Sequence, residues 1–291
     1  MKKIDINNLP EQGEPIDVFD YNQMYEDCFV DLDVVIERPP MAISIGTYEQ
    51  NGVTYDNAVH TYGEFSATVA PSKTKKTFYK SALIASYIGG DTINFFDNMK
   101  SHRDSEFYIV DIDTEQGAFY AQHAFRRIEM MTGAKYDNYL PFAMRSKTPE
   151  ERVKFVDCLL EDPRYKGKIK FISIDGIADL VENTNDIVMS AKIAQKVLKW
   201  TDVYGVHLHT VIHKLMNMEK PTGHLGSYIL KKAESVVFLE KIDPEDKHSD
   251  IKVIHKYSRG RDFPDFAFNV DKQGLPYKTD YIDLNDTNPS I

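Results

Sequence analysis

The stretch that decides the fold is TVAPSKTKKT, residues 68–77. A short β-like run ends in it, a polar loop follows, and a helix-like run begins at its last two residues. The phosphate-binding pattern G-x-x-x-x-G-K-[ST], laid on residues 70–77, finds Ala70 in place of the first glycine and Lys75 in place of the second. Only Lys76 and Thr77 match the pattern. Whether this loop still binds phosphate therefore depends on the groups that remain.

Lys76 and Thr77 open a helix directly after the loop. The first amide groups of a helix and the positive end of its dipole attract an anion. We expect Lys76 to neutralise the terminal phosphates of a nucleotide and the Thr77 hydroxyl to join the coordination of Mg²⁺. The other residues expected to contact the nucleotide are Ala70, Pro71, Ser72, Lys73, Thr74, Lys75 and Phe78.

The missing glycines predict weaker or slower nucleotide use rather than none. A left-handed backbone at Lys75 would cost about 1–2 kcal/mol. In compensation, Lys73, Lys75 and Lys76 bring three ammonium groups to a site for a tetra-anion. The amide donors and the helix dipole do not depend on glycine. We therefore interpret residues 68–77 as a phosphate loop of unusual composition.

Length and composition limit the classes of protein that fit. The chain has 291 residues and a formal net charge of −10, which is the size of one α/β domain with extensions and argues against a surface that binds nucleic acid everywhere. Cys28 and Cys158 are far apart and lack metal-ligand spacing, so a disulfide framework or a zinc site has no support. No segment approaches 18 apolar residues. We expect a cytoplasmic protein with no membrane association.

Three regions follow one another along the chain. Residues 1–40 are acidic and polar and predict an N-terminal extension, with Tyr21, Tyr25 and Phe29 as anchoring side chains. Residues 41–280 predict the main domain, and residues 281–291 a C-terminal tail. The pair Asn-Gly at 51–52, between two β-like runs, predicts a hairpin at about 41–62.

Strand-like and helix-like runs alternate after residue 64. The predicted strands are 64–70, 106–113, 139–144, 168–175 and 206–213, and the predicted helices are 76–88, 118–131, 186–205 and one that begins with a capping box at Thr148. Three strand-like runs at 234–242, 250–258 and 265–270 follow with only turns between them. The sequence therefore predicts an α/β fold with a mainly parallel sheet flanked by helices and an antiparallel extension at its C-terminal edge.

Acids follow two of the predicted strands, at the edge where ligands bind in open parallel sheets. Asp175 ends the apolar run FISI, and we expect it to hold Mg²⁺ through a water. Glu115 follows the strand 106–113, and we expect it to activate or orient the water that attacks the last phosphate. Either acid alone is more typical of a helix cap or a turn. Together with Lys76, in this order, they favour nucleotide binding.

The segments TVAPSKTKKTFYKSALIASY, YIVDIDTEQG, FISIDGIADLV, HTVIHK, GHLGSYILKKAESVVFLEK and HKYSRGRDFPDFAFNVD follow in an order that resembles RecA-like P-loop ATPases. The resemblance covers about residues 40–280 and is greatest to stand-alone ATPases of Bacteroidetes, mobile elements and phages, which are similar to DnaB-type helicase motors and RecA recombinases. It implies ATP and Mg²⁺ as cofactors, Glu115 as the catalytic glutamate and Asp175 as the second magnesium-associated acid. It also implies that His213 or Lys214 senses the γ-phosphate.

The same resemblance implies two kinds of partner. The loop 214–226 matches the position of a loop that contacts single-stranded DNA, although it could equally be a plain surface loop. Lys256, Arg259 and Arg261 resemble basic residues that reach the nucleotide of a neighbouring subunit in a ring or filament. The alternative is a solvated hairpin that pairs with nearby acids. The expected function is a motor or recombinase-type protein acting on DNA in replication, recombination or mobile-element and phage maintenance.

Two other functions compete with this one. The substitutions at Ala70 and Lys75, together with the net acidity, also fit a regulatory scaffold whose altered loop binds ATP or nothing. A small-molecule kinase could use the same loop, but we see no arginine-rich lid segment. His207 and His209 alternate on a predicted strand, and without a third ligand we expect them to be packing or surface residues rather than a metal site.

Overall fold

The computed structural model describes residues 19–89, 99–214 and 223–280. Its contacts divide the chain into two units, Met1–Arg38 and Pro39–Ile291. In the first unit, helix α1 (Tyr21–Cys28) is capped by Asp20, whose carboxylate accepts the amides of Asn22 and Gln23. The predicted anchoring rings contact one another, since Tyr25 lies against both Tyr21 and Phe29. The predicted tail 281–291 lies outside the described residues.

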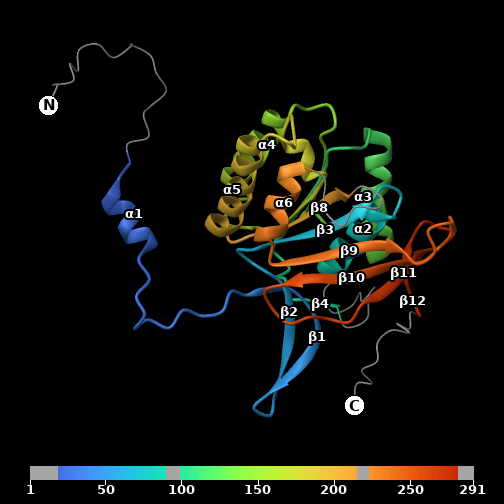
Figure 1. Ribbon diagram of the computed structural model, residues 1–291, viewed down its shortest axis with the longest axis horizontal. Coiled ribbons are helices and arrows are strands. Elements are labelled where there is room, and N and C mark those ends of the chain that lie inside the picture. Colours follow the sequence, from blue (N-terminus) through green and yellow to red (C-terminus); the bar gives the residue numbers. More distant parts are fainter. Residues whose placement is uncertain (1–18, 90–98, 215–222, 281–291) are drawn as a thin grey trace. The chain divides into compact units, whose positions relative to one another are not determined.

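A nine-stranded sheet forms the centre of the second unit (Figure 1), in the order β12-β11-β10-β9-β3-β8-β7-β5-β6. Six neighbouring strands are parallel, namely β9 (Ser235–Lys241), β3 (Phe65–Pro71), β8 (His207–Lys214), β7 (Ile169–Asp175), β5 (Tyr108–Asp113) and β6 (Tyr139–Ala143). The antiparallel strands β10 (Ile251–Ser258), β11 (Phe266–Val270) and β12 (Pro276–Thr279) complete one edge. The predicted α/β class, with a mainly parallel sheet and an antiparallel extension, is confirmed.

Side chains that alternate along the strands supply two hydrophobic cores, one on each face of the sheet. Val110 and Ile112 pack in a core with α4 (Pro149–Glu161), α5 (Ile187–Tyr204) and α6 (Gly223–Lys232). Ile109 packs in the other core, with α2 (Lys76–Gly89) and α3 (Ala118–Thr132). Each face of the sheet is therefore covered, as a mainly parallel sheet requires. Among the described helices, none has the length and apolar character needed to cross a membrane.

A second, three-stranded sheet in the order β2-β1-β4 adds to the core beneath α2. It consists of β1 (Met41–Gln50), β2 (Val53–Thr61) and β4 (Met99–Ser101). Asn51 and Gly52 join β1 to β2 with φ values of 54° and 75°, as a tight turn between antiparallel strands requires. The predicted hairpin is thus confirmed.

The predicted start of the helix at Thr148 and the predicted end of the helix at Gly205 are confirmed. Several short elements, in contrast, were not predicted. Thr148 and Glu151 form the predicted capping box at the start of α4, and Gly205 ends α5 in a left-handed conformation. The strands β4 and β12, the helices α1 and α6 and the short 3-10 helix η3 (Ile177–Leu180) were not predicted. These elements span ten residues or fewer, too few for a clear periodic pattern.

Candidate functional site

The loop between β3 and α2 contains two lysines in the left-handed conformation that glycine favours. Lys73 and Lys75 are left-handed, with φ values of 66° and 56°, each at a cost of about 1–2 kcal/mol. The Thr74 hydroxyl donates to the Pro71 carbonyl at 2.7 Å, which closes the turn from inside. The expected left-handed conformation at Lys75 is confirmed.

The side chain of Lys75 ties the loop to the antiparallel edge of the sheet. Its Nζ donates to the Ser249 carbonyl at 3.0 Å and to Asn269 Oδ1 at 2.5 Å. Burial lowers the pKa of Lys75, while the charge of Asp250 acts in the opposite direction. Its ammonium is therefore engaged with protein oxygens, in contrast to the expectation that it faces phosphate.

Lys76 stands at the first position of α2 and contacts Glu115 in the loop after β5 and His213 near the end of β8. Its Nζ lies 2.9 Å from both carboxylate oxygens of Glu115 and 2.5 Å from His213 Nε2, which itself lies 2.5 Å from Glu115 Oε1. We call these three residues the Lys76 cluster. Burial raises the pKa of Glu115, but hydrogen bonds from His213 and Lys76 outweigh it and lower the pKa to about 2. Glu115 is therefore a carboxylate at neutral pH.

Asp175 ends β7 beside this cluster. Thr77 Oγ1 donates to its Oδ2 at 3.4 Å, and Lys76 Nζ lies 3.9 Å from its Oδ1. Oδ1 is buried and has no hydrogen-bond partner among the described residues. A hydroxyl and a carboxylate with a spare oxygen are ligands that suit Mg²⁺, which is commonly held by one or two carboxylates together with phosphate oxygens. The residues therefore fit the metal. Neither here nor elsewhere does the described part of the chain contain a group of three His, Cys, Asp or Glu side chains placed to hold a metal ion, so the protein would supply only Thr77 and Asp175.

A buried lysine below the site was missed from the sequence. Lys80 is fully buried, with Nζ 3.0 Å from Asp111 Oδ1 and 3.6 Å from Asp175 Oδ2. The Tyr139 hydroxyl donates to Asp111 Oδ2 at 2.9 Å. Burial by itself would lower the pKa of Lys80, but Asp111 and Asp175 raise it. The available signal was its position one helical turn after Lys76, combined with an acid inside the apolar strand YIVDID.

Short hydrogen bonds lock the ends of β5 and β7 together around Glu115. The Asp113 carboxylate accepts the Glu115 amide at 3.0 Å. The Thr114 hydroxyl lies 2.7 Å from both the Asp175 carbonyl and Asp179 Oδ2. Gly176 follows with a φ of 98°, and a Cβ there would lie 2.5 Å from Thr114 Oγ1. Glycine is therefore required where these two strand ends approach.

Arg152 of α4 holds the neighbouring loops from below. Its buried guanidinium donates to the carbonyls of Met144 at 3.2 Å, Arg145 at 3.1 Å and Asp179 at 2.5 Å. Guanidinium supplies five donors in a fixed plane, so one side chain satisfies carbonyls from the loop after β6 and from η3. The sequence offered no signal for this role.

His213 and Lys214, the two alternatives for the sensing position, point in different directions. His213 belongs to the Lys76 cluster, whereas Lys214 Nζ donates to Glu240 Oε1 at 2.8 Å and lies over the Phe238 ring. Phe78, in the first turn of α2, packs under the guanidinium of Arg127 from α3. Ala70 and Pro71 form the end of β3, next to His213 and Lys214.

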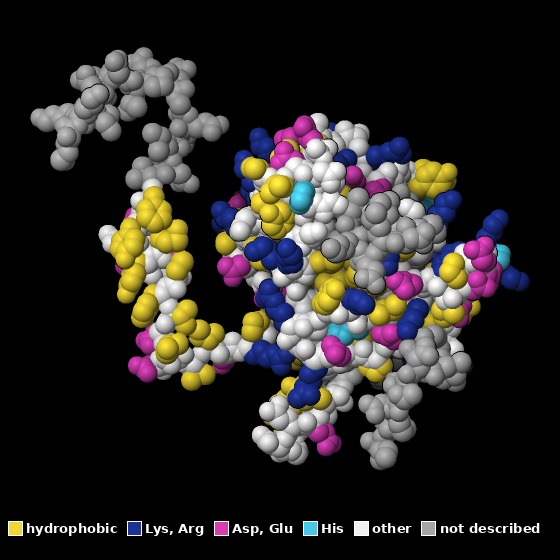
Figure 2. All heavy atoms as spheres, in the orientation of Figure 1, with side chains coloured by type: hydrophobic (Ala, Val, Ile, Leu, Met, Phe, Trp, Pro, Cys, Tyr) yellow, Lys and Arg dark blue, Asp and Glu magenta, His cyan; other side chains and the backbone are white. Residues whose placement is uncertain are grey.

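The other predicted partner sites lie in different places. Residues 215–222 of the predicted DNA-contacting loop lie outside the described residues, and Gly223 and Gly226 belong to α6 rather than to a loop. This part of the prediction was wrong because a helix begins at Gly223. On the face seen in Figure 2, basic and acidic side chains are interspersed over the second unit rather than gathered into one basic surface.

Lys256, Arg259 and Arg261 lie on or after β10, at the other end of the sheet from Lys76. Ser258 pairs with Ser235, which pairs with Ser66 near the start of β3, whereas the loop that carries Lys73 and Lys75 follows the end of β3. Lys256 is the additional residue of a bulge in β10. Arg259 Nη1 lies 2.7 Å from Glu64 Oε1, and the Arg261 guanidinium lies over the Tyr48 ring. None of these contacts involves the Lys76 cluster. The role of these residues at the nucleotide of a neighbouring subunit stays a prediction.

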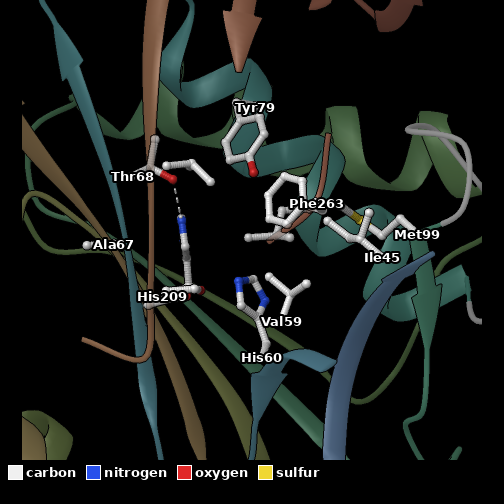
Figure 3. Close-up of a pocket in the computed structure, with 13 residues that line it drawn as sticks. Ile45, Val59, His60, Ala67, Thr68, Tyr79, Met99, His209 and Phe263 are labelled. Carbon is white, nitrogen blue, oxygen red and sulfur yellow. Dashed lines mark hydrogen bonds between the residues drawn. The ribbon is translucent and has the colours of Figure 1, made fainter. Parts of the chain in front are cut away.

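A separate polar layer lies beneath the three-stranded sheet (Figure 3). His209 Nε2 and Thr68 Oγ1 form a hydrogen bond of 2.9 Å. The rings of His60 and His207 are stacked, with their centroids 4.4 Å apart. Burial lowers the pKa of His207 to about 4 and that of His209 to about 3. A cavity of about 10 Å³ between His60 and His209 has room for one water. His207 and His209 are therefore packing residues, as one of the two alternatives predicted.

Comparisons with known proteins do not assign this site. Neither the models of protein families nor the curated proteins contain a match to the chain. The assignment of function therefore depends on the geometry of the residues themselves.

Proposed function

We propose that the chain is a RecA-like ATPase that binds ATP with Mg²⁺ and hydrolyses it. The observation that carries the proposal is the meeting of Lys76, Thr77, Glu115 and Asp175 at the carboxyl ends of three parallel strands. Ligands of open α/β sheets bind at this edge, and a lysine, a hydroxyl and two carboxylates are the groups that phosphoryl transfer requires.

Each group has a distinct part in the reaction. The Lys76 ammonium leaves Glu115 and contacts the terminal phosphates. There its positive charge offsets the negative charge that develops during phosphoryl transfer. Thr77 and Asp175 would hold Mg²⁺, which when bound neutralises phosphate charge and orients the phosphates. The amides at the start of α2 add further donors.

Glu115 accepts the proton of the attacking water or orients that water. With a pKa of about 2 in the Lys76 cluster, its carboxylate is a weak base. Once Lys76 contacts phosphate, Glu115 loses one of the two donors that lower its pKa, so its basicity rises when substrate is in place. His213 remains within 2.5 Å and keeps the carboxylate oriented.

The resemblance to helicase motors and recombinases extends the proposal to an oligomer that acts on DNA. Arg259 and Arg261 follow an antiparallel strand and lie far along the sheet from this chain's Lys76, so any role at a nucleotide is at a neighbour's site. Single-stranded DNA would contact the segment 214–226. Replication, recombination and the maintenance of mobile elements or phages are the processes in which such a motor would act.

Calorimetric titration with ATP in the presence of Mg²⁺ tests the proposal directly. We expect the wild-type chain to bind and Lys76→Ala to bind at least about tenfold more weakly, because a charge-assisted contact is lost. Lys192→Ala is the matched control, since this exposed lysine of α5 lies on the other face of the sheet. Absence of ATP binding by the wild type would overturn the proposal.

A regulatory scaffold is the second candidate, and the engagement of Glu115 favours it. Both of its carboxylate oxygens are occupied by Lys76, and one also by His213. Glu115→Gln separates the two candidates. An ATPase should keep nucleotide binding and lose about a hundredfold or more in turnover, whereas a scaffold should show no turnover in either form.

A further inference from the structure

The lysine that stands in place of the second loop glycine is bonded across the molecule. Lys75 holds a left-handed backbone, which glycine adopts without strain. Its Nζ reaches Ser249 in the turn before β10 and Asn269 in β11, residues 174 and 194 positions further along the chain. We call the Lys75 ammonium and these two acceptors the Lys75 latch.

Both acceptors of the latch are themselves fixed. Ser249 is buried, and its hydroxyl accepts the Asp243 amide at 2.8 Å. The Asn269 amide nitrogen donates to the His248 carbonyl at 2.9 Å and to Asp250 Oδ1 at 2.6 Å. Because the acceptors cannot follow a moving lysine, the latch fixes the position of the loop rather than the reverse.

Lys73 provides the contrast within the same loop. It is also left-handed, but its side chain is exposed and forms no hydrogen bond or ion pair with a described residue. The two lysines therefore carry the same charge and the same left-handed backbone, but Lys75 is partly buried and held by the latch, whereas Lys73 is exposed and is not held.

We propose that Lys75 is a positioning residue that holds the phosphate loop in its binding conformation through the antiparallel extension of the sheet. A glycine loop must lose conformational freedom when it wraps a phosphate, whereas a latched loop is already ordered. The strands β10 and β11 thus act on the nucleotide site without contacting the nucleotide. This inference rests on the proposed function, since the loop is taken to bind ATP.

The first experiment compares Lys75→Met with Lys73→Met. Each variant removes one ammonium from the loop, so a purely electrostatic role predicts similar losses of ATP affinity. We expect Lys73→Met to weaken binding by no more than about threefold and Lys75→Met by about tenfold or more. Equal losses in the two variants would overturn the inference.

Lys75→Gly sharpens the comparison, because it restores the residue that phosphate loops normally carry. If the lysine were merely a tolerated substitution, glycine would relieve strain and ATP would bind as tightly or more tightly. The latch predicts the opposite, a loss at least as large as that of Lys75→Met. Asn269→Ala combined with Lys75→Met should be no worse in binding than the more damaging single change, because both remove the same contact.

Amide hydrogen exchange decides the inference even if the wild-type chain binds no ATP. We expect the amides of Phe78 and Tyr79, which donate to the Lys75 carbonyl, to exchange about tenfold faster in Lys75→Met than in Lys73→Met. Exchange rates that match in the two variants would contradict the latch. Absence of ATP binding by the wild type would instead contradict the proposed function, and the comparison of exchange rates between Lys75→Met and Lys73→Met would still test the latch.

Discussion

The Lys76 cluster and the buried histidines His60, His207 and His209, which we call the histidine layer, are two polar regions beside β8 that differ in charge and access. The Lys76 cluster is partly exposed, carries an ammonium and two nearby carboxylates, and leaves a buried oxygen of Asp175 without a hydrogen bond. The histidine layer is fully buried, and burial lowers the pKa of His207 and His209 so that both are neutral. Charges concentrated where a ligand has access indicate a binding site, whereas neutral polar groups sealed beneath a sheet indicate packing.

The largest expected effect concerns the buried charges below the Lys76 cluster. Lys80→Met leaves Asp111 buried without its cation, and we expect a loss of about 3–5 kcal/mol in the free energy of unfolding. Lys80→Met combined with Asp111→Leu should recover part of that loss, because Asp111 no longer leaves an unpaired buried charge, whereas Asp175 still lacks the cation 3.6 Å from its Oδ2. Denaturant unfolding measures both. Equal destabilisation by the single and double variants would show that the pair matters through packing rather than charge.

Acid should weaken the histidine layer before it affects the carboxylates. The folded pKa values of His207 and His209 are about 4 and about 3, below the unfolded value, so the unfolded state takes up protons first and stability falls as pH decreases. Between pH 7 and pH 5 these two histidines should contribute a loss of about 3–4 kcal/mol, and the neighbouring His60, whose pKa burial also lowers, adds to it. Unfolding measured across this range tests it. His123→Gln, on the exposed side of α3, should leave the slope unchanged, and a flat profile in the wild type would contradict the prediction.

Gly176→Ala should have an intermediate effect that reaches the Lys76 cluster. A methyl group there would lie 2.5 Å from Thr114 Oγ1 on a left-handed backbone, so we expect a loss of about 2 kcal/mol in unfolding free energy. Glu115 follows Thr114 directly, and ATP affinity should also fall. Gly274→Ala is the control, because it too has a positive φ but no atom within 4 Å of the added carbon. Similar ATP affinity in the two variants would show that the Gly176 turn does not influence the nucleotide site.

The smallest effect on stability is expected from Arg259. Its ion pair with Glu64 is at the surface, so Arg259→Ala should change the unfolding free energy by less than about 1 kcal/mol. If Arg259 acts on a neighbour's nucleotide, the variant keeps ATP binding and loses turnover. Mixing Arg259→Ala with Lys76→Ala should then restore part of the turnover, because each supplies what the other lacks. A mixture with no more activity than its components would leave no trans role for Arg259.

The strand ends could be predicted from the sequence because parallel strands that alternate with helices all present their carboxyl ends at one edge. This places Lys76, Glu115 and Asp175 together before any coordinates. The orientation of His213 was also within reach, since it shares the alternation of His207 and His209 along β8, whereas Lys214 falls on the opposite side. The distance of Arg259 from Lys76 follows from the antiparallel direction of β10, which places the end of β10 near the start of β3. The antiparallel direction was predicted, but its consequence for Arg259 was not drawn.

Other parts of the site could not be predicted because they depend on which distant residues meet. A lysine in a helix and an aspartate in a strand form the buried pair of Lys80 and Asp111 only if the two elements pack in one register. Tyr139 joins them from the edge strand β6. Hydropathy disfavours both charges as core residues, so a pattern of apolar positions gives no sign of them.

The sequence by itself determined the local elements of this protein: the alternation of strands and helices, the capping box at Thr148 and the turn at Asn51 and Gly52. These depend on interactions between residues a few positions apart. Only the tertiary structure decided that Lys75 is bonded to Ser249 and Asn269, and that Glu115 is shared by Lys76 and His213. The physical reason is that such contacts require the strand order of the sheet, which brings residues between 39 and 194 positions apart within hydrogen-bond distance.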